Sequence, residues 1–252
     1  MIDLFEKCYK PGIADEAKAR GIYPYFHALE SKQDVTVIME GKRRIMLGSN
    51  NYLGLTTNEN VIRAGVEAYE AFGSGCSGSR FLNGTLKLHL ELEKELAAFL
   101  RKDEVVTFST GFQSNLGIIS ALVGLRDYVI MDRENHVSLY DGCRLSYGTM
   151  LRYRHSDMQD LEKKLQKVPE GAGCLIVTDG VFSMDGNVAP MDKITELANK
   201  YDALVMVDEC HSATASGVVG ESLESPWPPG TVARSSSTRM SYLAAHSIAR
   251  SM

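Results

Sequence analysis

The chain has 252 residues, which is enough for one large α/β domain or for one domain with an appendage. A net charge of −5, with 44% hydrophobic and 23% charged residues, argues against a nucleic-acid-binding surface, which needs a concentrated basic face. No apolar run reaches the roughly 20 residues of a membrane span, no secretory signal is recognisable, and five scattered cysteines predict neither disulfides nor a zinc ribbon, so we expect a cytoplasmic protein.

The first hundred residues predict mainly helices. Residues 3–30 have the pattern of an amphipathic helix that is broken by a Pro-Gly pair. Residues 35–47, "VTVIMEGKRRIML", predict two short strands joined by a tight turn. Apolar residues at helical spacing then predict helices over 58–72 and 85–100.

From residue 104 the pattern alternates between strand and helix. Two of the strand segments, "CLIVT" and "ALVMV", are apolar at every position, as strands covered on both faces must be. This alternation predicts an α/β fold of three layers, in which a mostly parallel, doubly wound sheet has helices on both faces. The predicted strands are 104–108, 127–131, 150–154, 174–178 and 203–208, and the predicted helices are 111–124, 138–147, 157–168 and 191–201.

A glycine-rich segment, "GSGCSG" at residues 73–78, matches the dinucleotide fingerprint G-x-G-x-x-G. That fingerprint binds a pyrophosphate only where it joins a buried strand to a helix. Here a predicted helix precedes it, and the bulky residues Arg80, Phe81 and Leu82 follow. We therefore do not expect a nicotinamide cofactor.

Ligands of doubly wound sheets bind beyond the carboxyl ends of the strands, so the residues after each strand are the candidates. After 104–108, Thr110 can cap a helix whose first N–H groups, with Gly111 allowing close approach, form an anion site. The alternative is a capped helix with nothing bound. After 127–131 comes His136, which could equally be a solvated surface group.

The two remaining strand ends carry further polar groups. Ser183 follows 174–178 in a turn that could be merely polar. Asp208 ends the last strand, where a buried carboxylate needs a cation or several donors. Asp208 and His211 could supply two metal ligands, but no third or fourth is evident from spacing, so we expect no metal. A phosphate site, imidazoles, a hydroxyl and a buried carboxylate together suit pyridoxal 5′-phosphate (PLP).

Six segments resemble the α-oxoamine synthases, the fold-type I PLP enzymes that condense an amino acid with an acyl-CoA. They are "SNNYLGL", "GSGCSGSRFLNGT", "STGFQSN", "ENHVSL", "TDGVFSMDG" and "MVDECHSA". The resemblance runs from about residue 3 to about Glu221. Residues 12–31 and 78–93 favour the branch that joins L-serine to palmitoyl-CoA with loss of CO₂, giving a 3-keto amine. The branches that form 2-amino-3-ketobutyrate or 8-amino-7-oxononanoate are the alternatives.

The resemblance implies cofactor-binding roles for residues at each strand end. Thr110, Gly111 and Phe112 would hold the cofactor phosphate and ring region. Ser183 would bond near the ring hydroxyl, and Asp208 would pair with the ring nitrogen.

It also implies catalytic and substrate-binding roles. His136 would stack on the pyridine ring and touch the substrate, and His211 would bond near the ring hydroxyl. With Asp208 these histidines form the implied catalytic set. Asn50 would reach the amino-acid carboxylate, and the complete protein would be a homodimer.

The last part of the chain departs from the family pattern. The family's imine-forming lysine lies about thirty residues after the ring-nitrogen aspartate, but here no lysine follows Lys200 and Arg239 cannot replace it. We expect an N-terminal helix and hairpin segment at 1–56, an incomplete PLP-binding large domain at 57–221, and an aberrant, disordered tail at 222–252 in place of the C-terminal small domain. The chain is then either an inactive fragment or a non-catalytic partner subunit.

Overall fold

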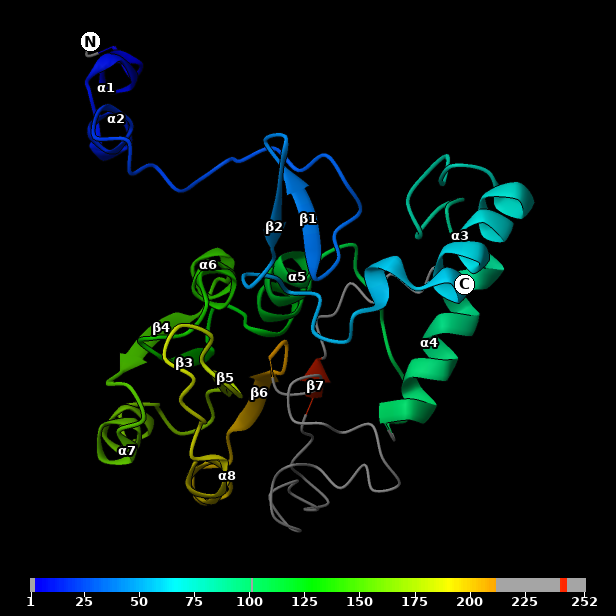
Figure 1. Cartoon of the computed structure of the whole chain (residues 1–252). Helices are drawn as coiled ribbons and strands as arrows, with labels where there is room; N and C mark the ends of the chain where they lie inside the picture. Colours follow the sequence, from blue (N-terminus) through cyan, green and yellow to red (C-terminus); the bar gives the residue numbers. More distant parts are fainter. Residues whose placement is uncertain (1–2, 101, 212–240, 244–252) are drawn as a thin grey trace. The chain divides into compact units, whose positions relative to one another are not determined.

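The structure is a computed structural model that describes residues 3–100, 102–211 and 241–243. The described residues divide into two compact units, one that ends at residue 71 and one that begins at residue 72. The secondary structure of both units is drawn in Figure 1.

The first unit consists of short helices and one hairpin, as the sequence predicts. Strands β1 and β2 pair antiparallel, with Thr36 opposite Ile45. Glu40 and Gly41 between them both have positive φ angles, 49° and 69°, which suits the tight turn of a two-residue hairpin. The elements are α1 (Glu6–Tyr9), α2 (Ile13–Ala19), β1 (Thr36–Met39), β2 (Lys42–Ile45), the 3-10 helix η1 (Leu55–Thr57) and α3 (Glu59–Phe72), whose last residue belongs to the second unit.

The second unit is built on a five-stranded sheet. Its strands run parallel in the order β4-β3-β5-β6-β7. The predicted doubly wound sheet is therefore confirmed. Its elements are α4 (Lys87–Leu100), α5 (Gly111–Leu122), β3 (Tyr128–Asp132), α6 (Val137–Leu145), β4 (Thr149–Tyr153), α7 (Met158–Leu165), β5 (Cys174–Asp179), α8 (Met191–Lys200), β6 (Leu204–Asp208) and β7 (Ser241–Leu243).

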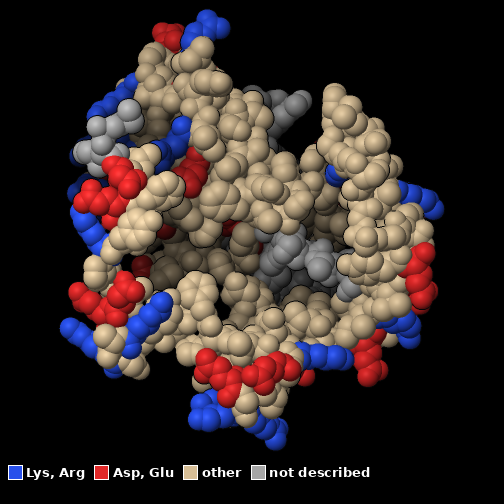
Figure 2. All heavy atoms as spheres, turned by 90° about the horizontal axis from the view of Figure 1, so that it is seen from above, with Lys and Arg blue, Asp and Glu red and all other residues tan. Residues whose placement is uncertain are grey.

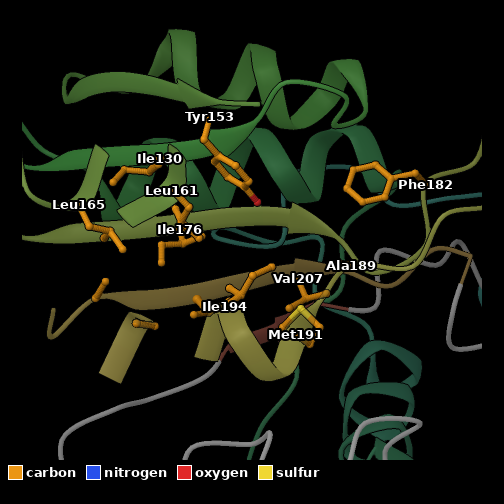
Figure 3. Packing of buried hydrophobic residues seen from close by; sticks show 13 residues of the cluster. Ile130, Tyr153, Leu161, Leu165, Ile176, Phe182, Ala189, Met191, Ile194 and Val207 are labelled. Atoms are coloured by element: carbon orange, nitrogen blue, oxygen red, sulfur yellow. The ribbon is translucent and has the colours of Figure 1, made fainter. Parts of the chain in front are cut away.

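Two apolar clusters, one on each face of this sheet, form the three predicted layers. On one face Ile130, Ile176 and Val205 pack with residues of α7 and α8 (Figure 3). On the other face Val129 and Val177, with neighbouring strand residues, pack with residues of α5 and α6. Successive strand residues point to opposite faces, so the position along a strand decides which helix pair a side chain meets.

One predicted strand is wrong. Residues 104–108 have no strand structure. The backbone N–H of Thr107 donates to Oε1 of Glu93 over 2.8 Å, so a side chain of α4 takes the place of a strand neighbour. The predicted tail, 222–252, lies outside the described residues except for β7.

Acidic and basic side chains are interspersed on the face that Figure 2 shows. Among the described residues drawn there, they form no concentrated basic patch. Among the described residues, no helix has the length and apolar character needed to cross a membrane.

Candidate active site

The amino end of α5 has the geometry that can hold an anion. Thr110 caps the helix, because its hydroxyl accepts from the N–H of Gln113 over 3.1 Å, as predicted. The N–H groups of Gly111 and Phe112 belong to the first turn, where a helix has no internal acceptor for them. They are therefore available to a phosphate, which the helix dipole also favours.

Two buried carboxylates lie side by side at the carboxyl edge of the sheet. Asp179 ends β5 and Asp208 ends β6, and the two are register partners. They are 5% and 4% exposed. Asp179 lies two residues after Val177, and Asp208 lies two residues after Met206. By strand alternation, each carboxylate therefore points to the same face of the sheet as that apolar residue, which packs with α5 and α6. Both carboxylates therefore point to the helix pair whose amino ends can bind a ligand.

Asp208 is held by two donors. Its Oδ2 accepts from Nδ2 of Asn115 over 2.7 Å, and its Oδ1 accepts from the N–H of Cys210 over 3.0 Å. A carboxylate oxygen has two lone pairs, so the group can still accept a hydrogen bond from a ligand. Asn115 lies one turn after the start of α5 and was missed from the sequence. Its position, four residues after Gly111 on the same helix face, was the available signal.

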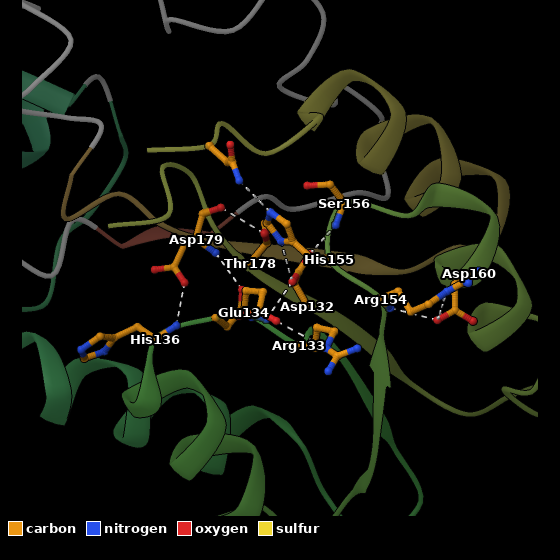
Figure 4. Close-up of polar contacts among 12 residues, drawn as sticks. Asp132, Arg133, Glu134, His136, Arg154, His155, Ser156, Asp160, Thr178 and Asp179 are labelled. Atoms are coloured by element: carbon orange, nitrogen blue, oxygen red, sulfur yellow. Dashed lines mark hydrogen bonds and ion pairs between the residues drawn. The ribbon is translucent and has the colours of Figure 1, made fainter. Parts of the chain in front are cut away.

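Asp179 was also missed from the sequence. The pKa of its carboxyl is raised to about 7, and burial is the largest cause of this net shift. A hydrogen bond from the backbone N–H of His136 lowers the pKa, and the nearby Asp208 and Asp132 raise it. That bond joins the N–H of His136 to Oδ2 of Asp179 over 2.7 Å (Figure 4). Asp179 thus positions the start of α6.

His136 caps α6, close to the predicted position. Its Nδ1 lies 2.7 Å from Oγ of Ser138 and accepts from the N–H of Ser138 over 3.3 Å. The imidazole points away from Asp179 (Figure 4). Because its backbone bonds to the end of β5 and its ring bonds to α6, His136 is held at the same sheet edge as Asp208.

A second buried acidic cluster lies on the opposite side of the sheet. Asp132 accepts from the N–H groups of Glu134 and Ser156, both over 2.9 Å, and lies 3.0 Å from Nδ1 of His155 (Figure 4). Asp132 lies two residues after Ile130, so by strand alternation its side chain points to the same face of the sheet, toward α7 and α8. The bonds from His155 and Ser156 hold the loop after β4 in place, so we infer that this cluster has a structural role.

The other predicted site residues lie in loops. Ser183 is exposed in the turn between β5 and α8, and His211 is half-buried three residues after Asp208. Asn50 belongs to the first unit, where the Tyr52 hydroxyl donates to its Oδ1 over 3.4 Å. Its position relative to Asp208 is therefore not described.

Neither a metal nor a thiolate is indicated at this edge. Within the described ranges, no three His, Cys, Asp or Glu side chains are grouped to hold a metal ion. Burial and the adjacent Asp208 raise the pKa of the Cys210 thiol, so it stays protonated near neutral pH. A protonated thiol is a weak nucleophile.

The glycine-rich segment is not a dinucleotide fingerprint. It follows α3 instead of a strand. The N–H groups of Leu82, Asn83 and Gly84 all bond to the carbonyl oxygen of Ser79. A Cβ atom added at Gly84 would collide with the carbonyl group of Gly78, so the loop needs that glycine to fold back on itself.

The groups at this edge fit PLP. The first N–H groups of α5 suit a phosphate, and the Asp208 carboxylate suits a protonated ring nitrogen. No lysine follows Lys200 in the sequence. Lys200 ends α8, before β6, and pairs with Glu162 over 2.7 Å, so it lies toward the opposite edge of the sheet.

Residues 42–245 match the family model described as aminotransferase class I and II, and the chain belongs to this family. A serine palmitoyltransferase of Bacteroides thetaiotaomicron is 51% identical over 217 residues, which are 86% of this chain and 55% of the relative. An 8-amino-7-oxononanoate synthase of Exiguobacterium sibiricum is 47% identical over 208 residues, 82% of this chain and 53% of the relative.

Solved structures agree with this assignment. A serine palmitoyltransferase from S. paucimobilis with a bound PLP–myriocin aldimine superposes with a TM-score of 0.80 at 40% identity, covering 84% of this chain and 54% of that chain. The resemblance to the α-oxoamine synthases and the fold-type I architecture is confirmed. The chain spans about half the length of the relatives that it matches.

Proposed function

We propose that this chain forms the cofactor-binding part of a PLP-dependent acyltransferase that condenses L-serine with palmitoyl-CoA. The reaction releases CoA and CO₂ and yields a 3-keto amine. The observation that carries the proposal is the meeting of an anion-binding helix start, His136 and the buried Asp208 at one sheet edge. The names of the similar proteins support the substrate class. An 8-amino-7-oxononanoate synthase or a 2-amino-3-ketobutyrate CoA ligase remains the alternative.

Each residue has a physical task in this proposal. Thr110, Gly111 and Phe112 bind the phosphate through the start of α5. Asp208 accepts from the ring nitrogen and keeps it protonated, and the protonated ring, when bound, stabilises negative charge that forms on the substrate α-carbon. His136 covers the ring and orients the substrate.

The remaining predicted residues complete the site. Ser183 and His211 bond near the ring hydroxyl. Asn50 binds the substrate carboxylate. These three assignments rest on the family resemblance.

A first experiment tests the cofactor on the chain itself. Dialysis against PLP, followed by absorbance of the protein fraction, should give saturable binding at one site per chain. The variant Asp208→Ala should bind PLP at least about tenfold more weakly, because the ring nitrogen loses its partner. Equal binding by both proteins would contradict the site.

A second experiment tests the reaction and uses the gene resequenced past codon 221. Its product should release CoA from palmitoyl-CoA with L-serine. Comparable release only with glycine and acetyl-CoA would move the assignment to the ketobutyrate ligase.

A non-catalytic partner subunit is a second candidate, favoured by the absence of any lysine after Lys200. We propose that the complete protein is a homodimer, because large apolar side chains such as Phe5, Tyr9 and Phe81 are exposed. Sedimentation of the purified chain, alone and mixed with a catalytically complete relative, distinguishes a homodimer from a non-catalytic partner subunit. Assembly only in the mixture would support the partner subunit.

A further inference from the structure

Two buried side chains join Asp208 to His136 through a continuous series of hydrogen bonds. Nδ2 of Asn115, on α5, lies 2.7 Å from Oδ2 of Asp208 and 2.8 Å from Oγ of Ser138, on α6. Oγ of Ser138 lies 2.7 Å from Nδ1 of His136. Asn115 and Ser138 are each 1% exposed, so water does not compete for these bonds.

The chemistry of the end groups fixes the direction of these bonds. An ionised Asp208 can only accept, so Asn115 must present its NH₂ group and not its carbonyl oxygen. The second hydrogen of that NH₂ group goes to Oγ of Ser138. The Ser138 hydroxyl therefore has its own hydrogen left to donate to Nδ1 of His136. The backbone N–H of Ser138 points to the same nitrogen over 3.3 Å.

We propose that Asn115 and Ser138 are positioning residues that orient the Asp208 carboxylate and hold His136 as the tautomer protonated on Nε2. With two donors directed at Nδ1, the imidazole keeps that nitrogen as an acceptor and presents its only N–H at Nε2. The α5–α6 pair thus sets both the acceptor for the ring nitrogen and the donor above the ring. This inference rests on the proposed function, in which Asp208 and His136 face the cofactor.

The carbonyl oxygen of Asn115 supports this role. Oδ1 of Asn115 is buried and has no hydrogen-bond partner among the described residues. An unpartnered buried oxygen destabilises a fold, so stability alone does not explain an asparagine at this position. Its two donated hydrogen bonds do explain it.

The tautomer is tested first, on the chain without cofactor. Long-range ¹H–¹⁵N correlation spectra of histidine-labelled protein distinguish protonation on Nδ1 from protonation on Nε2, and His136→Gln identifies the signal. The native chain should carry the proton on Nε2. Ser138→Ala should give a mixture of tautomers, and Ser138→Thr, which restores the hydroxyl, should return the native signal. Loss of packing alone would not be reversed by the larger threonine.

Cofactor affinity tests the Asp208 end. Asn115→Ala should raise the Kd for PLP about tenfold, because Asp208 loses a donor and its fixed orientation. Ser120→Ala is the matched control on α5, since its exposed hydroxyl donates to the carbonyl oxygens of Leu116 and Gly117 in its own helix. Its Kd should stay within about twofold of the native value.

The outcomes are separable. An unchanged tautomer in Ser138→Ala, or an unchanged Kd in a folded Asn115→Ala, overturns the inference. Ser138→Ala removes a single oxygen, so it decides the question if Asn115→Ala does not fold. If the native chain binds no PLP, the proposed function fails, whereas the tautomer measurement needs no PLP and still tests the link between α5 and α6.

Discussion

At the scale of single residues, Asp208 combines deep burial with hydrogen bonds from Asn115 and from the backbone N–H of Cys210. In the protein from the complete gene, Asp208→Asn should retain PLP but lose turnover on the order of 10²-fold, because an amide does not hold the ring nitrogen protonated. CoA release measures the loss. Asp202→Asn, in the exposed turn before β6, is the control and should keep full turnover. Near-native turnover of Asp208→Asn would show that Asp208 has only a structural role at the end of β6.

Asp179 should make the stability of the cofactor-free chain depend on pH. Its folded-state pKa is raised from the ordinary 3.8 to about 7, so its favourable contribution is complete below pH 3.8 and is lost as pH rises through 7. Asp179→Asn keeps an oxygen for the N–H of His136 and removes the charge. At pH 8 the variant should be more stable by about 2 kcal/mol.

Urea unfolding between pH 4 and 8 measures this difference. Asp202→Asn again serves as control, because its side chain is exposed. If the unfolding free energies of the native chain and of Asp179→Asn change with pH in the same way, the burial of the ionised Asp179 does not destabilise the fold.

The sequence predicted the ends of the strands but not which of their polar groups meet. Thr110, His136 and Asp208 were chosen as candidates because each follows a recognisable strand or caps a helix. Asn115 lies inside a helix, where an asparagine has no distinguishing pattern. Asp179 was passed over as part of a polar turn, because its burial depends on its register with β6.

At the scale of elements, an ion pair fastens the loop that precedes α5. Arg80, from the glycine-rich loop, forms two bonds with the carboxylate of Glu93 on α4, through Nη1 and, over 2.9 Å, through Nη2. Glu93 also accepts from the N–H and the hydroxyl of Thr107, both over 2.8 Å. The glycine-rich loop, α4 and the segment before α5 thus meet at the carboxylate of Glu93. Thr107, which bonds to it, lies three residues before Thr110.

Removing this carboxylate's charge should destabilise the fold. The pKa of Glu93 is lowered from the ordinary 4.5 to about 2. The hydrogen bonds from Arg80 are the largest cause, burial opposes them, and the hydrogen bonds from Thr107 act in the same direction as Arg80. The stabilising contribution of Glu93 is therefore present above pH 4.5 and lost as pH falls through 2. Because the pair is partly exposed, Glu93→Gln should cost about 1–2 kcal/mol at pH 7.

Thermal unfolding at pH 7 and at pH 3 tests this effect. The difference between native and variant should shrink at the lower pH. Glu91→Gln, on the same helix and paired with Lys87 at the surface, should change stability by less than about 0.5 kcal/mol. An equal loss in both variants would contradict a special role for Glu93.

The predicted elements from residue 127 to residue 208 agree with the structure to within a few residues. Strands such as "CLIVT" are covered on both faces, and this leaves a continuous apolar run that is easy to recognise. Residues 104–108 have a similar composition, but Thr107 bonds to a side chain and not to a strand. Sequence cannot tell which partner a backbone N–H will find.

At the scale of the whole molecule, the distribution of lysines limits the chemistry. Borohydride reduction of the chain in the presence of PLP, followed by peptide mapping, should give no single dominant modified lysine, because none follows Lys200. The chain should also fail to turn over serine.

Lys102 is the lysine to examine in that map. Burial lowers the pKa of its ammonium group, although the nearby Glu209 acts in the opposite direction. Glu209 directly follows Asp208, at the carboxyl edge of β6. A stoichiometric adduct on Lys102 together with CoA release would mean that a lysine from another part of the fold had been recruited.

In the parallel sheet, the connections that leave the strands and those that enter them lie at opposite edges. His136 follows the carboxyl end of β3, and Asp179 and Asp208 are the last residues of β5 and β6, whereas the connection from α7 to β5 reaches the amino edge. There Glu170 and Gly171 are exposed, and Gly171 has a φ of 79° with open space where a Cβ atom would lie. A biotin-acceptor peptide inserted between them would tether the protein to a sensor surface by the edge opposite the cofactor site. Immobilised in this orientation, the molecule would keep its binding edge open to solution.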